Sequence, residues 1–318
     1  MRASPRAAAS LFGAAVLLAA CTASGSPSVS PSGSPATNPS PASSPSPAPT
    51  PPPAPNVVLA AGDIGSCDVS GDEQTAALLD HLGGTVLTLG DHAYRNGTAD
   101  DFASCYDPNW GRHRDRTYPI PGNHDYRTTD AAPYFAYFGA RAGRPDEGWY
   151  SFDLAGWHVI ALNSNCDEIG GCGADSPQAA WLRADLDAHP VACTLAMWHH
   201  PRWSSGDDHG SDPRTDAFWR LAHDEGVDVV LSGHDHEYER FVPMNADGAA
   251  EPDGMVAFVV GTGGRSLTGF GPILPTSAAH DNSTFGVLKL TLRPHGYDWE
   301  FVPATNTAFT DTGSADCR

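Results

Sequence analysis

Side chains able to bind metal ions follow five apolar segments of this sequence. The clearest case is Gly90-Asp91-His92-Ala93-Tyr94, which follows the run 85–89 and places a carboxylate and a phenol three residues apart. Similar groups follow the other runs, and the whole set is Asp63, Asp91, Tyr94, Asn123, His199, His234 and His236. This mixture of oxygen and nitrogen donors suits iron, zinc or manganese and does not suit copper(I). His234 and His236 alternate by two, so an extended backbone would point both toward one site and let each serve a different metal.

The segments that must position these donors alternate between strands and helices. Short apolar runs predict buried strands over 57–61, 85–89, 192–198 and 227–231. Start signals and apolar stripes predict helices over 72–82, from Ser176 onward, and over 212–226. The alternation of strand and helix is typical of a parallel sheet, and ligand sites of α/β proteins lie at the carboxyl ends of such strands. The donors are therefore expected to meet at one edge of the fold.

The remaining segments carry weaker signals. Alternating apolar residues predict a hairpin of 149–154 and 157–162, turning at Ala155-Gly156. Three further strands are predicted over 255–260, 285–292 and 297–302, with no helix between them. The stretch 95–116 is polar and aromatic and shows no clear period.

Five short motifs in a fixed order carry a resemblance to a known family. They are Gly62-Asp63-Ile64-Gly65, Gly90-Asp91-His92-Ala93-Tyr94, Gly122-Asn123-His124-Asp125, His199-His200-Pro201 and Gly233-His234-Asp235-His236. In this order they resemble the metallophosphoesterase (calcineurin-like) superfamily, and Tyr94 with Glu237-Tyr238-Glu239-Arg240 resembles its purple acid phosphatase branch. The resemblance implies an α/β (α+β) fold, a four-layer sandwich of two mixed sheets flanked by helices. It also implies the compact form, without the additional β-sandwich domain of the larger plant members.

The resemblance also implies roles for individual residues. Asp63, Asp91, Tyr94 and His236 match the ligands of a ferric ion, and Asp91 matches the carboxylate that bridges to a second metal. Asp91, Asn123, His199 and His234 match the ligands of that second, divalent ion, which is iron, zinc or manganese. His199, and not His200, occupies the His-x-Pro position. His124 matches a histidine beside the bound phosphate, and His209 resembles an outer-sphere histidine of the family, so both are candidate catalytic residues.

The implied function is hydrolysis of phosphate monoesters. Two metal ions neutralise phosphate oxygens, and a metal-activated hydroxide attacks phosphorus in line. His124 and His209 are expected to orient the phosphate or protonate the leaving alkoxide. One alternative is a phosphodiesterase or nucleotidase with the same metals. A second is a surface lipoprotein that binds phosphate or metal without turnover.

Charge limits the partners. The chain has 18 Lys and Arg against 38 Asp and Glu, a formal net charge of −20, and Lys289 is its single lysine. Such a field repels nucleic-acid backbones, so a nucleic-acid scaffold role is excluded. Small phosphoester substrates must then be held by something local and strongly positive, such as metal ions. The oligomeric state does not follow from the sequence.

The amino-terminal residues predict export. Residues 1–21 have a basic start, an apolar run too short to span a bilayer, and Leu18-Ala19-Ala20-Cys21, which resembles a bacterial lipobox. Residues 22–56 lack charge and are almost all Pro, Ser, Ala, Thr and Gly, which predicts a disordered linker. Residues 57–318 are then the catalytic domain. The expected location is the outer face of a bacterial cell membrane, reached through the lipid anchor alone, with a secreted protein as the alternative.

Six cysteines remain besides Cys21, and an even number in an exported chain predicts disulfides. Cys166 with Cys172 would close a small Gly-rich loop, Cys67 with Cys105 would join two loops, and Cys193 with Cys317 would secure the carboxyl terminus. Zinc binding is the alternative, although none of the spacings is Cys-x-x-Cys.

Several other polar residues have no motif. Structural surface or core roles are expected for His92, His113, His158 and His223. Glu239 and Arg240 are expected to form an ion pair, and Arg95 and Arg202 are expected to be solvated surface residues.

Overall fold

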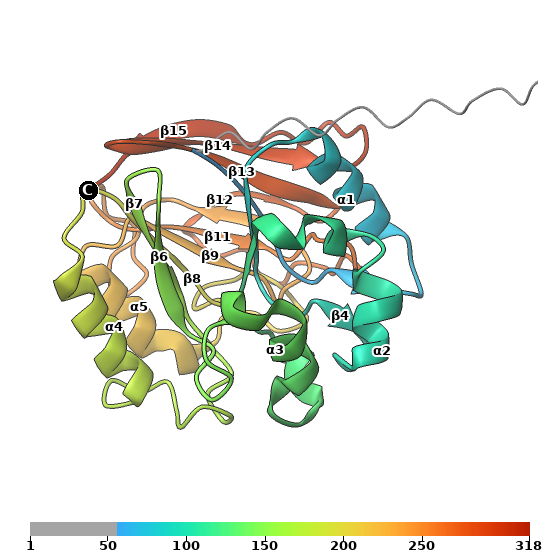
Figure 1. Cartoon of the computed structure of the whole chain (residues 1–318). Helices are drawn as coiled ribbons and strands as arrows, with labels where there is room; N and C mark the ends of the chain where they lie inside the picture. Colours follow the sequence, from blue (N-terminus) through green and yellow to red (C-terminus); the bar gives the residue numbers. More distant parts are fainter. Residues whose placement is uncertain (1–55) are drawn as a thin grey trace, which may run out of the picture. The chain divides into compact units, whose positions relative to one another are not determined.

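Two large sheets form the centre of the computed structural model, which describes residues 56–318 (Figure 1). The predicted signal segment 1–21 with Cys21, and nearly all of the predicted linker 22–56, lie outside the described residues. Within residues 56–318, no helix has the length and apolar character needed to cross a membrane.

The first sheet contains six strands in the order β15-β14-β13-β1-β3-β5. Strands β1, β3 and β5 are parallel, while β13 and its neighbours run antiparallel. Four-residue and five-residue apolar runs with little polar interruption explain why β1 and β3 are buried on both faces. The bounds are Val57–Ala61 for β1, Thr85–Thr88 for β3, Thr117–Pro119 for β5, Gly286–Arg293 for β13, Gly296–Pro303 for β14 and Thr312–Asp316 for β15.

The second sheet contains seven strands in the order β12-β10-β11-β9-β8-β7-β6. Its central strands β7, β8, β9 and β11 are parallel, and both edges are antiparallel. The predicted hairpin is confirmed as β6 and β7. The bounds are Tyr150–Leu154 for β6, Trp157–Ala161 for β7, Thr194–Met197 for β8, Val229–Ser232 for β9, Tyr238–Phe241 for β10, Val256–Val260 for β11 and Ser277–Asp281 for β12.

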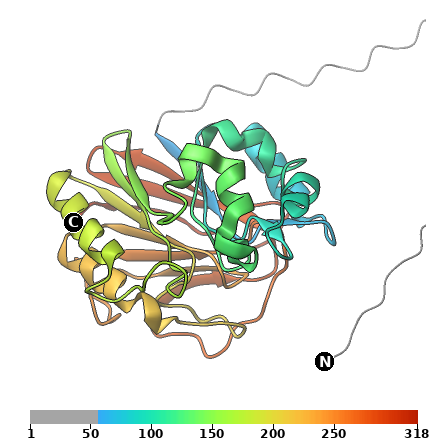
Figure 2. The same cartoon turned by 60° about the horizontal axis from the view of Figure 1, so that its bottom comes forward.

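The two sheets face each other across one apolar core, and helices cover a second core. Leu59 and Leu87 of the first sheet join Leu195 and Phe258 of the second in the inner core. On the opposite face of the second sheet, α4 (Pro177–Ala188) and α5 (Asp216–Asp224) bury residues such as Phe218 (Figures 1 and 2). Helix α1 (Gly71–His81) packs beside β13. The predicted sandwich of two mixed sheets with helices outside is confirmed.

Short helical turns lie before and after β5 in the region 95–142, whose first part, 95–116, showed no clear period in the sequence. They are α2 (Ala99–Asp101), η1 (Phe102–Tyr106), η2 (Trp110–Arg116), η3 (Asp125–Arg127), η4 (Thr129–Ala131), α3 (Ala132–Phe138) and η5 (Gly139–Ala142). Aromatic rings pack on one another here, with the Phe102 and Phe138 centroids 6.1 Å apart. Elements of three to seven residues are too short to show a 3.6-residue period, so tertiary contacts define them.

All three predicted disulfides are present. Cys67 pairs with Cys105, Cys166 with Cys172, and Cys193 with Cys317. The zinc alternative fails for these six cysteines, because each sulfur is already bonded to another. Among the described residues, the carboxyl-terminal tail is thereby joined to the start of β8.

The expected ion pair between Glu239 and Arg240 is wrong. Glu239 is fully buried and accepts hydrogen bonds from the backbone N–H and the hydroxyl of Ser205 at 2.8 and 2.6 Å. Arg240 instead forms two contacts to Asp311, at 2.7 and 2.9 Å. Adjacent residues of a strand point to opposite faces, which is why neighbours in the sequence have different partners here.

The histidines without motifs have structural partners. His92 is buried, and its ring nitrogens contact Asp125 and Thr88 at 3.0 and 2.7 Å. His158 is buried, and its ring nitrogens contact the carboxylates of Asp153 and Asp185. Arg202 stacks over Trp203 at 3.8 Å and pairs with Asp216.

Candidate metal centre

The seven proposed ligands lie together where strands of both sheets end. Asp63 follows β1, Asp91 follows β3 and Asn123 follows β5, all from the first sheet. His199 follows β8, and His234 and His236 follow β9, from the second sheet. Tyr94 lies in β4 (Ala93–Tyr94), which pairs with β2 (Gly65–Ser66). The site therefore forms at the junction of the carboxyl ends of both sheets.

Three of these residues adopt an uncommon backbone conformation. Asp63, Asp91 and His234 have φ angles of 61°, 53° and 75°. Non-glycine residues rarely adopt positive φ, and such strain gathers at functional sites. Neighbouring glycines make room for this geometry, because a Cβ at Gly90 would overlap the His199 ring and a Cβ at Gly122 would overlap Asp91.

One group of donor atoms surrounds the Tyr94 hydroxyl. This oxygen lies 3.0 Å from a carboxylate oxygen of Asp63, 3.0 Å from Oδ2 of Asp91 and 3.2 Å from Nε2 of His236. Nε2 of His236 is 3.3 Å from the same oxygen of Asp63. One phenolic proton cannot be donated to two carboxylates at once, so these atoms are under-supplied with positive charge.

A second group of donor atoms surrounds Nε2 of His199. It lies 3.1 Å from Oδ1 of Asn123, 3.2 Å from Nδ1 of His234 and 3.6 Å from Oδ1 of Asp91. The other ring nitrogen of His199 contacts the Leu89 carbonyl oxygen at 2.7 Å and therefore carries a proton. In a neutral His199, Nε2 would then direct a lone pair at the Asn123 oxygen. A cation between these two atoms would remove the repulsion between their lone pairs.

The Asp91 carboxylate lies between the two groups. Its Oδ2 faces the Tyr94 group and its Oδ1 faces the His199 group. Oδ1 also accepts a hydrogen bond of 2.7 Å from the His124 backbone N–H. One carboxylate directed toward two donor groups is the arrangement expected of a bridge between two metal ions.

Surrounding residues hold the donors in orientation. Ser266 Oγ contacts Nδ1 of His236 at 2.7 Å, which leaves Nε2 free to face the site. Asp125 is fully buried and accepts hydrogen bonds from the backbone N–H groups of Asp91 and Gly122, at 3.1 and 2.9 Å. Such outer contacts fix ligand rings and loops. No sequence pattern pointed to Ser266. Asp125 is the last residue of the Gly122-Asn123-His124-Asp125 motif, but no role was predicted for it from the sequence.

The protein's own charges favour a cation in this site. Burial opposes the charge on Asp91, but His199, His124 and His234 hold the pKa of this carboxyl well below its usual range. Burial lowers the pKa of His199, yet the Asp91 carboxylate outweighs it and the pKa rises to about 9. Burial and the carboxylates of Asp63 and Asp91 raise the pKa of Tyr94 well above its ordinary value. The carboxylates of Asp63 and Asp91 thus favour positive charge in the site and oppose ionisation of the Tyr94 phenol.

The donor set fits a pair of metal ions. Carboxylate, phenol, amide and imidazole groups are ligands for iron, zinc or manganese. Two overlapping groups of side chains could each hold an ion, Asp63 with Asp91 and His199, and His199 with His200 and His234. In the second group, Nδ1 of His200 is already engaged by the Ser164 hydroxyl at 2.7 Å.

The two candidate catalytic histidines lie at the margin of the donor groups. The His124 ring is 4.3 Å from the Tyr94 ring, and its Nδ1 contacts the Arg95 carbonyl oxygen at 2.7 Å. The His209 ring stacks on that of His234 at 4.0 Å, with the planes inclined by 20°. Both are near enough to the site to contact a bound ester and neither belongs to a donor group.

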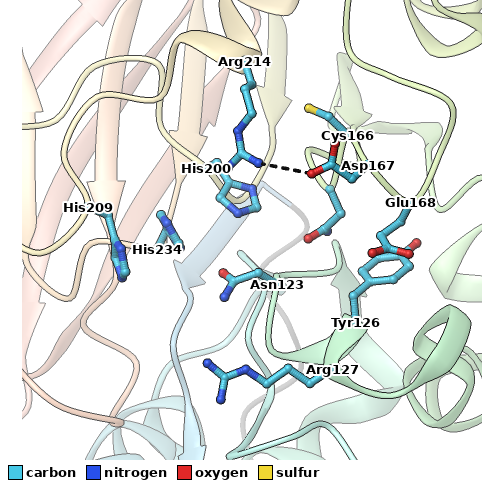
Figure 3. A pocket seen from close by; sticks show the side chains of 11 residues that line it. Asn123, Tyr126, Arg127, Cys166, Asp167, Glu168, His200, His209, Arg214 and His234 are labelled. Carbon is cyan, nitrogen blue, oxygen red and sulfur yellow. Dashed lines mark ion pairs between the residues drawn. The ribbon is translucent and has the colours of Figure 1, made fainter.

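A pocket of about 380 Å³ opens beside the second donor group (Figure 3). Its walls include Asn123, His200, His209 and His234 from the site. The remaining lining residues are Tyr126, Arg127, Asn165, Cys166, Asp167, Glu168 and Arg214. The pocket leaves space for a ligand next to the candidate metal centre.

The chain is therefore an α/β sandwich with a candidate metal centre at the carboxyl ends of its strands. Residues 56–238 match the Calcineurin-like phosphoesterase family, and the chain belongs to that family. Membership implies a dinuclear metal centre.

The chain is similar to purple acid phosphatases of Arabidopsis thaliana. It is 29% identical to purple acid phosphatase 22 over 222 residues, covering 62% of this chain and 49% of the relative. It is 32% identical to purple acid phosphatase 18 over 160 residues, covering 45% of this chain and 35% of the relative. The chain thus spans about half, or less, of the length of these relatives.

A solved structure shares the fold. The purple acid phosphatase PPD1 from yellow lupin (Lupinus luteus) seeds superposes with a TM-score of 0.66 at 19% identity. The likeness covers 82% of this chain and 53% of the lupin chain.

Proposed function

We propose that this protein hydrolyses phosphate monoesters at a dinuclear metal centre of purple acid phosphatase type. The observation that carries the proposal is the Asp91 carboxylate, whose two oxygens face two separate groups of donor atoms. The presence of Tyr94 in one of these groups favours the purple branch within the family.

The proposed ligands divide between two ions. Ferric iron is assigned to Asp63, Asp91, Tyr94 and His236, because burial and two carboxylates keep the phenol protonated unless a strongly Lewis-acidic cation replaces its proton. A divalent ion, iron, zinc or manganese, is assigned to Asp91, Asn123, His199 and His234. When bound, the two ions neutralise phosphate charge and activate a water molecule for attack on phosphorus.

The protein's own residues then orient the ester and move a proton. His124 donates from Nδ1 to the Arg95 carbonyl, so its Nε2 faces the site, 3.9 Å from Oδ2 of Asp91. A protonated His124 or His209 would donate a hydrogen bond to the phosphate or a proton to the leaving alkoxide. The ring of His209 is kept in place by its stacking on His234.

The test combines metal analysis, colour and turnover. Purified protein is expected to contain about two metal ions per chain, to absorb visible light and to hydrolyse p-nitrophenyl phosphate. Tyr94→Phe should abolish the visible band, because the band requires the phenolate–iron bond. A colourless, metal-free and inactive protein would refute the proposal.

Two comparisons separate the alternatives. A preference for bis-p-nitrophenyl phosphate over the monoester would identify a phosphodiesterase with the same metals, and faster release of phosphate from nucleotides would identify a nucleotidase. Stoichiometric binding of phosphate or metal with no product would identify a binding lipoprotein.

We also propose that the protein is exported and lipid-anchored through Cys21. Three disulfides support export, because such bonds persist in oxidising compartments. Labelling with a palmitate analogue should mark the wild type and not Cys21→Ala, and unaltered labelling of the variant would contradict the anchor.

A further inference from the structure

In the wall of the pocket beside the candidate metal centre lies an arginine that has no carboxylate partner within the described residues. Arg127 is exposed, and its one polar contact among residues 56–318 is a hydrogen bond of 3.4 Å to the Arg95 carbonyl. Arg214, the other arginine of this wall, differs: it contacts both carboxylate oxygens of Asp212 and lies 3.9 Å from Asp167. The positive charge of Arg127 is therefore available to a ligand, whereas that of Arg214 is largely neutralised.

Arg127 is held close to the reacting groups. It belongs to η3, the turn that follows Asn123 and His124. The Arg127 and His124 side chains both donate to the Arg95 carbonyl oxygen. Figure 3 shows the guanidinium beneath the Asn123 carboxamide, across the pocket from Arg214. A group bound by Arg127 would consequently lie next to the ester.

The Tyr126 ring, next to Arg127 in the chain, provides an aromatic surface in the pocket wall. Tyr126 is half-buried, and its hydroxyl accepts a hydrogen bond of 2.8 Å from Asn163. The neutral body of a small ester can pack against this ring, with its phosphate toward the metals and its other end toward Arg127. Glu168 also lines the pocket, which restricts the anionic end of the substrate to the side of Arg127.

The acidic net charge of the chain gives weight to the lack of a carboxylate partner for Arg127 within residues 56–318. With a formal charge of −20, the protein has many carboxylates with which an arginine could pair. A guanidinium matches carboxylate and phosphate groups with two parallel hydrogen bonds. We propose that Arg127 binds a second anionic group on the substrate, so that the preferred substrates are phosphate monoesters whose alcohol part carries a carboxylate or a second phosphate. This inference rests on the proposed monoester hydrolysis.

The test compares pairs of esters that differ in the second anion. The carboxylate arm uses 3-carboxyphenyl phosphate and its methyl ester, and the phosphate arm uses propane-1,3-diyl bisphosphate and propyl phosphate. Wild-type protein is expected to show higher kcat/KM for the member with the second anion in at least one arm. Arg127→Gln should lower that preference about tenfold, since it removes charge-assisted hydrogen bonds. Arg127→Lys should retain part of it.

The matched control is Arg183→Gln, which removes an exposed arginine of α4 that does not line the pocket. It should leave the preference within twofold of wild type. An equal loss for both members of each pair in Arg127→Gln would overturn the inference, because Arg127 would then act on the phosphate common to all esters. An unchanged preference would also overturn it.

Failure of the proposed function gives a different result. If the wild type hydrolyses none of the four esters, monoester hydrolysis itself is wrong. Calorimetric titration with propane-1,3-diyl bisphosphate then tests Arg127 alone. Binding that is about tenfold tighter in wild type than in Arg127→Gln supports the second-anion site, and equal binding contradicts it.

Discussion

At the scale of single residues, the site depends on side chains that the sequence identified and on others that only contacts reveal. Asp235 is an example of the second kind. It lies between the proposed ligands His234 and His236, is fully buried, and accepts hydrogen bonds from the backbone N–H groups of His209 and Gly210, at 3.1 and 3.0 Å. The Ser204 hydroxyl donates to it as well, at 2.5 Å. One carboxylate thus anchors the loop that carries His209.

Asp235→Asn is expected to loosen this loop. The carboxamide offers one accepting oxygen in place of two. Its N–H₂ group must therefore face either the Ser204 hydroxyl or the loop N–H groups, where a carboxylate oxygen now accepts. We expect kcat to fall about tenfold for esters with poor leaving groups and much less for p-nitrophenyl phosphate, since proton donation matters most for a poor leaving group.

The control for Asp235→Asn is Asp208→Asn, an exposed carboxylate of the same loop. Metal content and KM should be unchanged in both variants. An equal fall in kcat for good and poor leaving groups would show that Asp235 does not act through His209.

At the scale of elements, the strand ends and the turns that follow them shape the centre. The turn between β5 and η3 passes so close to Asp91 that a Cβ on Gly122 would overlap its carboxylate and backbone nitrogen. Asp91 cannot easily move away, because its backbone has a left-handed conformation and its N–H donates a hydrogen bond to Asp125. The turn therefore has no room to adjust to a larger side chain.

Gly122→Ala is expected to displace the Asp91 carboxylate and weaken metal binding. Disturbing groups that orient ligands typically lowers metal affinity about 10- to 100-fold. Metal content measured by mass spectrometry after dialysis should fall below two per chain, with the circular dichroism spectrum unchanged. Gly173→Ala is the matched control, because nothing lies within 4 Å of a Cβ there. Full metal retention in Gly122→Ala would contradict the expected displacement.

A buried histidine connects the β6–β7 hairpin with α4. Nδ1 of His158 contacts Asp153 at 2.9 Å, and its Nε2 contacts Asp185 at 2.8 Å. Burial lowers the pKa of His158, but Asp185 and Asp153 outweigh burial and raise the pKa above its ordinary value of 6.5. The protonated form is therefore favoured in the folded state. Its stabilisation is fully present below pH 6.5 and is lost as pH rises through the folded-state pKa.

His158→Gln should consequently destabilise the domain more at low pH than at high pH. We expect a loss of unfolding free energy of about 2 kcal/mol near pH 6, from charge-assisted hydrogen bonds, and a smaller loss near pH 9. Urea unfolding at a series of pH values measures the difference. The comparison variant is His223→Gln, at a half-buried histidine whose longer contacts of 3.4 and 3.5 Å should make its loss near pH 6 smaller. A loss that stays constant for His158→Gln would contradict the raised pKa.

At the scale of the whole molecule, disulfides connect parts that lie far apart in the sequence. Cys193 and Cys317 are separated by 124 positions, and Cys166 and Cys172 by 6. A cross-link restricts the unfolded chain more when it closes a longer loop, by about 5 kcal/mol for the first bond and about 2 kcal/mol for the second.

The double variant Cys193→Ser with Cys317→Ser should therefore lose more stability than Cys166→Ser with Cys172→Ser. Differential scanning calorimetry of both variants under identical conditions measures the two losses. The loop closed by Cys166 and Cys172 lines the pocket. The variant that lacks this bond is therefore a control for global stability and not for substrate binding. Equal losses, or the reverse order, would refute the loop-length argument.

Much of the fold was predictable because its signals are local. The buried strands, the hairpin and the capped helix α4 follow from apolar runs and start signals, and Ser176 does accept the capping hydrogen bond from Ala179 at 3.2 Å. Strands β5, β10, β12 and β15 were missed, as were the two-residue strands β2 and β4. β12 alternates between partly buried and exposed residues without large apolar side chains, so its pairing with β10 defines it.

The donor groups of this protein, and their positions after apolar segments, could be read from the sequence alone. Periodicity and turn residues are properties of neighbouring positions, so they can be read without a structure. The folded structure shows that donors from two different sheets meet and that the two oxygens of Asp91 face different groups. It also shows that, within residues 56–318, Arg127 has no carboxylate partner while Arg214 has two. These outcomes depend on contacts between residues far apart in the chain, which no local pattern specifies.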